Sequence, residues 1–115
     1  MNYTFSMSAN KIVCYLYTSF DQKEKLIDFI KHYKKYRSGL GHKLVICFKL
    51  LNSEEIIKIR KYLKNIKYTE FIDPNKTNDW DFGSYKRVAK YFYNKDILFL
   101  NSHSYPICNN WLKKL

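Results

Sequence analysis

Short apolar runs alternate with amphipathic segments along most of this chain, and this alternation is the feature that most restricts its fold. Each apolar run has the length of a buried strand, and the segment after it has apolar residues at the spacing of one helix face. We expect strands at 11–18, 42–51, 66–72 and 96–100, and helices at 22–36, 53–64, 84–94 and from Pro106 onwards. This alternation predicts a parallel sheet joined by right-handed crossovers. The predicted fold class is α/β, with three α/β/α layers and a mostly parallel sheet.

The apolar content of each run predicts its place in the sheet. The run at 11–18 is nearly continuous, so we expect it to form the central strand. The run at 97–100 is too short for a helix and also predicts an interior strand. The run at 66–72 is more polar and indicates an edge strand. We expect the following residues to be buried: Ile12, Val13, Leu16, Val45, Ile46, Val88, Leu98 and Leu100.

The length of 115 residues predicts one domain, with residues 1–10 as a flexible lead-in and residues 11–115 as a single α/β domain. Cys14 and Cys47 fall within apolar runs, and Cys108 is far from both in the sequence. They indicate thiols in a reducing compartment, not disulfides or zinc ligands. No apolar run has the length of a membrane span, and the first ten residues lack the apolar core of a signal peptide. We expect a cytoplasmic protein, with a peripheral position at the inner membrane face as a further option.

The chain is strongly basic, with 21 Lys and Arg residues against 10 Asp and Glu residues, a net charge of +11. This charge favours anionic partners such as nucleotide phosphates, nucleic acid or a membrane surface. A solvated lysine-rich surface is the alternative explanation for most of these residues. The lysines are spread over several predicted elements and do not form one basic patch with interleaved aromatic residues. Nucleic-acid binding is therefore only the third of the functions considered below.

Polar side chains follow three of the predicted strands. Thr18 and Ser19 follow the first strand, Asp73 follows the third, and residues 101–104 (NSHS) follow the fourth. Because parallel strands end at the same edge of a sheet, we expect these residues to lie on one edge. Ligands of open α/β sheets bind at the carboxyl ends of the strands. This edge is the predicted binding site.

The third predicted helix begins at the same edge, and its first residues are suited to an anion. Asp81 and Ser84 are good helix N-caps, and Gly83 allows another group to come close to the backbone. Free backbone N–H groups at a helix start bind phosphates, and Arg87 lies one turn further along. We expect Gly83 and Arg87 to face a diphosphate and Asp73 to accept hydrogen bonds from a base or ribose.

Each of these residues also has a purely structural explanation. Helix capping explains Asp81 and Ser84 equally well. A solvated helix position explains Arg87, and a turn with Pro74 explains Asp73. His103 has no carboxylate near it in the sequence, so we interpret it as a polar surface residue. The tryptophans, Trp80 and Trp111, are interpreted as packing residues and not as stacking surfaces.

The motif at 81–89 (DFGSYKRVA), the following run at 97–102 (ILFLNS) and the pair Trp111-Leu112 resemble a known family. They resemble the donor-binding half of glycosyltransferases with the A-type fold, close to family 2 and rhamnan-synthesis-like enzymes. The resemblance covers residues 11–115 and implies a Rossmann-like nucleotide-diphospho-sugar transferase fold. It implies a nucleotide-sugar site formed by these residues: Thr18, Ser19, Asp73, Asp81, Gly83, Arg87, Asn101 and Ser102.

Enzymes of that family end the fourth strand with an acidic motif that holds Mg²⁺ or Mn²⁺ on the sugar nucleotide. In this chain the corresponding residues, Asn101, Ser102 and His103, offer no carboxylate. We therefore expect no metal ligands there and only weak metal dependence. Family members also continue beyond this point with a half that binds the acceptor and usually holds the catalytic base. The expectation is a truncated or split product, and we identify no catalytic residue.

The leading hypothesis is a glycosyltransferase-like domain that binds a UDP- or GDP-sugar for transfer to a cell-surface polysaccharide or related acceptor. It would be an enzyme only if it is complete or complemented by the missing half. The alternative is a non-catalytic nucleotide-binding or interaction module, and the third is a basic nucleic-acid-binding protein. We also expect a homodimer or a complex with a second polypeptide, because an absent half would leave apolar surface uncovered.

Overall fold

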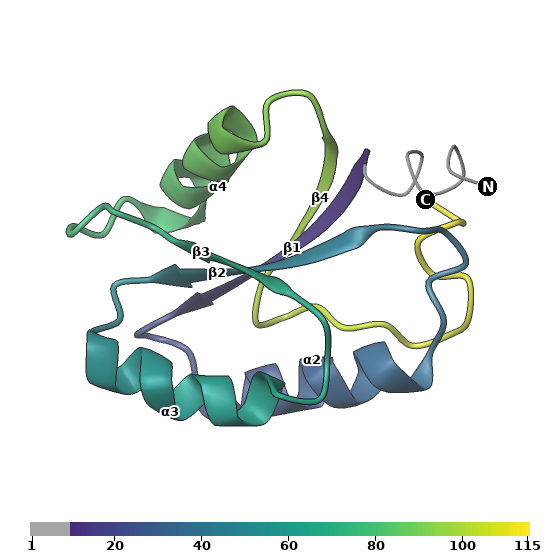
Figure 1. Ribbon diagram of the computed structural model, residues 1–115, viewed down its shortest axis with the longest axis horizontal. Helices are drawn as coiled ribbons and strands as arrows, with labels where there is room; N and C mark the ends of the chain where they lie inside the picture. The colour runs from purple at the N-terminus through teal and green to yellow at the C-terminus, as the bar shows by residue number, and fades with distance from the viewer. Residues whose placement is uncertain (1–9) are drawn as a thin grey trace.

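The computed structural model describes residues 10–115, which form a four-stranded parallel sheet with helices on both faces (Figure 1). The strands are β1 (Lys11–Thr18), β2 (Lys43–Lys49), β3 (Thr69–Ile72) and β4 (Asp96–Leu100). The helices are α2 (Lys23–Lys35), α3 (Ser53–Leu63) and α4 (Trp80–Tyr91). The α/β class and the parallel sheet are confirmed, and the arrangement is compatible with a Rossmann-like fold. The predicted lead-in lies almost wholly outside the described residues.

The strand order is β3-β2-β1-β4, so β1 is an interior strand and β3 an edge strand, as predicted. The prediction of an interior strand at 97–100 is wrong. Within residues 10–115, β4 pairs only with β1. An apolar run in the sequence indicates that both faces of a strand are covered, but it does not indicate whether both edges are paired with other strands. One face of β4 meets α4, where Phe99 stacks on Tyr85 with ring centroids 4.4 Å apart. On the other face, Leu100 packs against the apolar core that includes residues of α2 and α3.

Alternate residues of β1 serve two separate apolar cores. Val13 and Tyr15 point to the face covered by α2 and α3, whereas Ile12 and Cys14 point to the face covered by α4. The α2/α3 face is the larger core and includes Leu26, Phe29 and Ile30 of α2 and Ile56, Ile59 and Leu63 of α3. On the α4 face, Val88 is the buried apolar residue of the helix. The two faces are therefore covered to very different extents.

Burial confirms most of the predicted core and corrects part of it. Ile12, Val13, Leu16, Val45, Ile46 and Val88 are buried, but Leu98 and Leu100 are only half-buried. Their partial exposure follows from the edge position of β4. Both strand cysteines, Cys14 and Cys47, are buried and unbonded.

The predicted C-terminal helix is absent, and residues 101–115 form turns. The backbone N–H groups of this segment have partners elsewhere: Asn110 donates to the Arg37 carbonyl at 2.7 Å, and Leu112 to the Ser38 carbonyl at 3.0 Å. Asn110 also has a φ of 62°, which interrupts a right-handed helix. The segment runs along the α2 side of the sheet (Figure 1), where Trp111 and Leu112 pack against the core. Within residues 10–115, no helix has the length and apolar character needed to cross a membrane.

Candidate functional site

The carboxyl ends of all four strands lie at one edge of the sheet, as predicted, since every strand pair is parallel. From β1 the chain steps through β2 to β3 in one direction and then crosses back to place β4 on the other side of β1. The direction in which successive strands are added to the sheet therefore reverses, and the reversal lies between β1 and β4. At such a switch point the connecting segments leave toward opposite faces, and the crevice between them is the usual ligand site of α/β sheets.

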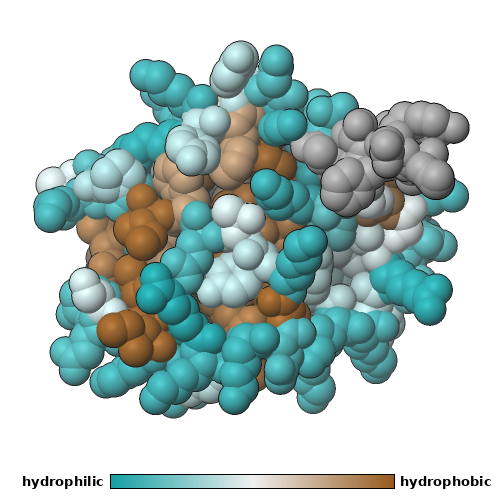
Figure 2. Space-filling model, in the orientation of Figure 1, coloured by the Kyte–Doolittle hydropathy of each residue, from teal (hydrophilic) through white to brown (hydrophobic). Residues whose placement is uncertain are grey.

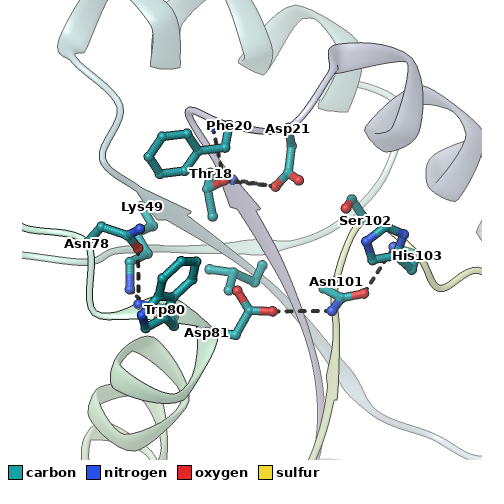
Figure 3. A pocket seen from close by; sticks show the side chains of 11 residues that line it. Thr18, Phe20, Asp21, Lys49, Asn78, Trp80, Asp81, Asn101, Ser102 and His103 are labelled. Atoms are coloured by element: carbon teal, nitrogen blue, oxygen red, sulfur yellow. Dashed lines mark hydrogen bonds between the residues drawn. The ribbon is translucent and has the colours of Figure 1, made fainter.

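A cavity of about 420 Å³ lies at this switch point, and we call it the switch-point cavity. It is enclosed by the ends of β1, β2 and β4 and by the start of α4 (Figure 3). Its lining residues are Leu16, Thr18, Phe20, Asp21, Lys49, Asn78, Trp80, Asp81, Asn101, Ser102 and His103. Most of the lining residues are polar, and Leu16, Phe20 and Trp80 contribute apolar surface beside them.

Thr18, Asp81, Asn101 and Ser102 were predicted from the sequence, and they line this cavity. Asn101 donates from Nδ2 to Asp81 Oδ2 at 3.2 Å and accepts from the His103 N–H at 3.0 Å. The bond to Asp81 ties the end of β4 to the first turn of α4 (Figure 3). On the opposite wall, the Asp21 carboxylate accepts from the backbone N–H of Thr18 at 2.8 Å and from its hydroxyl at 3.1 Å.

Ser19 was also predicted, but it lines a different, more open cavity of about 570 Å³ between α2 and α3. This adjoining cavity shares Thr18 and Asp21 with the switch-point cavity and carries Lys23, Lys58 and Lys61 on its walls. It lies over the α2/α3 face, beside the switch-point cavity.

The predicted residues Asp73, Gly83 and Arg87 do not line the switch-point cavity. Asp73 and Arg87 form an ion-pair network beside it, and Gly83 lies against the Asp79 carboxylate of that network. Arg87 binds Asp73 through Nε at 2.6 Å and Nη2 at 2.7 Å, and it also binds Asp79 through Nη1 at 2.9 Å. Lys49 Nζ completes the network with a 2.5 Å contact to Asp79. We call these residues, Lys49, Asp73, Asp79 and Arg87, the ion-pair network. Its two positive and two negative charges balance.

The carboxylate of Asp73 is fully enclosed, with no exposed side-chain surface. It accepts from Arg87, from the Ser84 hydroxyl at 2.5 Å and from the Asn75 N–H at 3.0 Å. Burial raises the pKa of Asp73, but the hydrogen bonds from Arg87 and Ser84 more than offset this and hold it below the ordinary value of 3.8. Hydrogen bonds from Arg87 and Lys49 lower the pKa of Asp79 as well. Both carboxylates are therefore ionised at neutral pH and occupied by protein donors.

The helix that carries Arg87 begins at Trp80, four residues before the predicted start at Ser84. Ser84 is consequently not an N-cap but a buried helix residue, and Asp81 lies in the first turn. Asp79 occupies the N-cap position without making a side-chain cap bond. Gly83 does allow a close approach, as predicted, and the approaching group is the Asp79 carboxylate, which a Cβ at Gly83 would overlap. The glycine therefore accommodates the ion-pair network.

Several polar and aromatic cavity residues were not predicted as site residues: Lys49, Phe20, Asp21, Asn78, Trp80 and His103. Lys49 could have been found, because it follows the apolar run of β2 just as Thr18 follows that of β1. Its side chain is only 2% exposed, whereas we had counted the lysines as surface residues. Trp80 is 72% exposed and does not serve as the predicted packing residue, while Trp111 does pack against the core.

Within residues 10–115, no three His, Cys, Asp or Glu side chains come together in a way that could hold a metal ion. Comparisons of the chain with protein-family models, with curated proteins and with solved structures found no match. The function is therefore argued from the geometry of the switch-point cavity.

Proposed function

We propose that the switch-point cavity binds a nucleoside-diphosphate sugar, of the UDP- or GDP-sugar class, in a glycosyltransferase-like domain of the A-type fold. The observation that carries this proposal is the position of the cavity between the ends of β1 and β4, next to the start of α4. Phosphates bind at helix starts because the first backbone N–H groups of a helix have no partner within it. A twelve-residue helix provides such a start here.

The side chains of the cavity suit the remaining parts of such a ligand. Asp21 and Asp81 are hydrogen-bond acceptors for the hydroxyl groups of ribose or of a transferred sugar. Asn101 and Ser102 offer both donors and acceptors at the end of β4. Arg87 is bound to Asp73 and Asp79, so the phosphates are assigned to the helix start and not to its guanidinium. If the domain acts as an enzyme, it transfers the sugar to a polysaccharide or related acceptor.

Isothermal titration calorimetry with UDP, GDP, UDP-glucose and GDP-mannose tests this proposal, each with Mg²⁺ or Mn²⁺ and with a chelator. We expect binding that depends only weakly on the metal, because no group of three metal-ligating side chains lies within residues 10–115. Binding that disappears with the chelator would instead assign a metal to Asp21 and Asp81. No binding of any of these nucleotides at millimolar concentration would favour a non-catalytic interaction module.

Two serines give a matched pair of variants. Ser102→Ala removes a hydroxyl from the switch-point cavity, and Ser19→Ala makes the same change in the adjoining cavity. We expect weaker nucleotide binding for Ser102→Ala and unchanged binding for Ser19→Ala. The reverse result would place the nucleotide between α2 and α3 and would contradict the proposal.

We also propose that the chain associates with a second copy of itself through the β3 side of the molecule. Ile57, Ile72 and Tyr91 are more than half exposed. Hydrophobic side chains gather on the face where β3 lies between α3 and α4 (Figure 2). Light scattering should show a dimer that Ile72→Lys dissociates, whereas Ile107→Lys, at a comparably exposed position on the C-terminal segment, leaves it intact. A monomer at all concentrations would contradict this.

A further inference from the structure

Trp80, the first residue of α4, has an unfavourable backbone conformation. Its φ of 62° lies in the left-handed region, where a side chain crowds the backbone and which large residues rarely adopt. Two hydrogen bonds hold this conformation: the Trp80 N–H donates to Asn78 Oδ1 at 3.1 Å, and its carbonyl accepts from Lys49 Nζ at 2.6 Å. Strained backbone of this kind persists only where the surrounding structure fixes it.

Lys49 is the residue that connects this strain to the rest of the fold. It lies at the end of β2 with its side chain almost fully buried, and its ammonium group donates to the Asp79 carboxylate and to the Trp80 carbonyl at the start of α4. Removing an ammonium group from water is costly unless it is paired. Lys49 is paired with Asp79, which Arg87 also holds. A rigid strand end therefore fixes the position of Trp80.

The result of this arrangement is an aromatic ring that the protein itself does not cover. The Trp80 side chain is 72% exposed and lines the switch-point cavity. Phe20, which lines the same cavity from the segment after β1, is 71% exposed. Both rings lie at the same side of the cavity, with Thr18 and Lys49 near them (Figure 3). Exposed aromatic faces beside a polar cavity provide surfaces on which a nucleobase stacks.

We propose that Trp80 is the stacking surface for the base of the bound nucleotide and that Lys49 is a positioning residue that holds it in place. The inference rests on the proposed function, and it assigns the base to the Trp80 and Phe20 side of the cavity. The phosphates then extend toward the first turn of α4, and the hydroxyl groups toward Asp21 and Asp81.

Tryptophan fluorescence tests this directly, because the chain contains only two tryptophans. Trp111 is half-buried and donates from Nε1 to the Tyr36 carbonyl. In the Trp111→Phe variant, Trp80 is the sole indole, and UDP or GDP should quench its emission. Inorganic pyrophosphate has no base and should leave the emission unchanged, although calorimetry detects its binding. In the Trp80→Phe variant, the emission of Trp111 should not respond to UDP.

Substitutions at Trp80 separate stacking from stability. Trp80→Ala should weaken UDP binding by about fivefold to 150-fold, since base stacking on an aromatic side chain contributes about 1–3 kcal/mol. Pyrophosphate binding should not change, and Trp80→Phe should retain most of the UDP affinity. Trp80→Gly should bind UDP as poorly as Trp80→Ala but unfold at a higher temperature than Trp80→Ala, because glycine adopts a positive φ without strain. Lys49→Met should weaken UDP binding and reduce the quenching of Trp80.

The outcomes distinguish this inference from the proposed function. UDP affinity that is unchanged in Trp80→Ala, with no quenching in Trp111→Phe, would overturn the stacking role and leave nucleotide binding intact. Normal UDP binding by Lys49→Met would overturn the positioning role. Failure of UDP, GDP and pyrophosphate to bind at all would overturn the proposed function and this inference together.

Discussion

The two faces of the sheet are held by different forces. On the α2/α3 face, helices and strands meet through apolar side chains, including the fully buried Phe29 and Leu26. On the α4 face the apolar core is small, and Val88 is its buried apolar helix residue. The start of α4 is held instead by the ion-pair network from β2 and the end of β3. The face with the least apolar burial is thus the one that positions the switch-point cavity.

We infer that apolar burial mainly determines the free energy of unfolding, whereas the ion-pair network mainly fixes the positions of residues beside the cavity. Apolar burial stabilises roughly in proportion to the buried area and is non-directional, so it sets no particular distance between polar atoms. Charged hydrogen bonds add less net stability, because desolvation offsets much of their attraction, but they require defined distances and angles. We therefore expect variants of the α2/α3 face to change mainly the free energy of unfolding. Variants of the α4 face should also change its pH dependence and the cavity.

The largest loss of stability should come from the α2/α3 face. Phe29 is fully buried and stacks on Tyr15 with ring centroids 4.2 Å apart. Phe29→Ala should lower the free energy of unfolding by about 3–5 kcal/mol, measured by urea denaturation. Phe92 is the half-buried residue that caps the C-terminus of α4, and Phe92→Ala should cost less. Equal losses for the two variants would contradict the contrast between the faces.

Arg87→Met should have the next largest effect, because it leaves the enclosed Asp73 carboxylate without its bidentate partner. Loss of a partner from a buried polar group costs about 1–3 kcal/mol, and more when the group is charged. We expect a loss in this range at pH 7 from urea denaturation. A variant as stable as the original would show that Ser84 and Asn75 suffice to hold the carboxylate.

The pH dependence of the same variant gives an independent check. The pKa of Asp73 is lower in the folded chain than its ordinary value of 3.8, so its contribution to stability is complete above that value. This contribution is lost as the pH falls through the lower folded-state pKa. Without Arg87 the pKa of Asp73 rises, so the stability of Arg87→Met should begin to fall at a higher pH. Parallel pH profiles for both proteins would contradict the assignment.

Gly83→Ala should be destabilising, although the same change usually favours a helix by about 1 kcal/mol. The added methyl group would overlap the Asp79 carboxylate, which Lys49 and Arg87 hold in place. Overpacking of this kind costs about 1–3 kcal/mol, so we expect a net loss of about 1 kcal/mol. In the Asp79→Ala background the clash is absent, and Gly83→Ala should then stabilise. A loss in both backgrounds would show that Asp79 is not the cause.

The sequence predicted what depends on local pattern. The strands from Lys11 to Thr18 and from Asp96 to Leu100 and the shared edge of the strand ends were expected, because apolar periodicity and chain direction decide them. The edge position of β4 could not be predicted, since burial of faces and pairing of edges leave the same apolar signal. The prediction of a C-terminal helix was wrong because backbone N–H groups of this segment bind the carbonyls of Arg37 and Ser38. These contacts join segments that are far apart in the sequence.

The switch-point cavity lies at the edge where the sequence predicted a binding site, but Asp73, Gly83 and Arg87 are not among its lining residues. Asp73 and Arg87 were expected to face a ligand, yet they bind each other across the start of α4. A sequence shows that charged residues gather at one edge, but not whether they neutralise one another or a ligand. The position of Lys49 at the end of the β2 run was visible in the sequence, but only the fold reveals that its side chain is enclosed.

The smallest effect is expected where an ion pair lies outside both faces. Lys11 and Asp96 join the first residues of β1 and β4, with Nζ and Oδ2 2.5 Å apart, but their side chains are 39% and 76% exposed. Water and salt screen such a pair, and exposed pairs contribute roughly 0–1 kcal/mol. Lys11→Met should therefore change the free energy of unfolding by less than about 1 kcal/mol in low salt, and by less still in 1 M NaCl.

Arg87→Met should keep most of its larger loss at high salt, because the protein and not the solvent surrounds Asp73. Equal salt sensitivity of the two variants would show that the ion-pair network is as accessible to solvent as the Lys11–Asp96 pair. It would contradict the contrast in which charged hydrogen bonds fix positions and apolar burial provides stability.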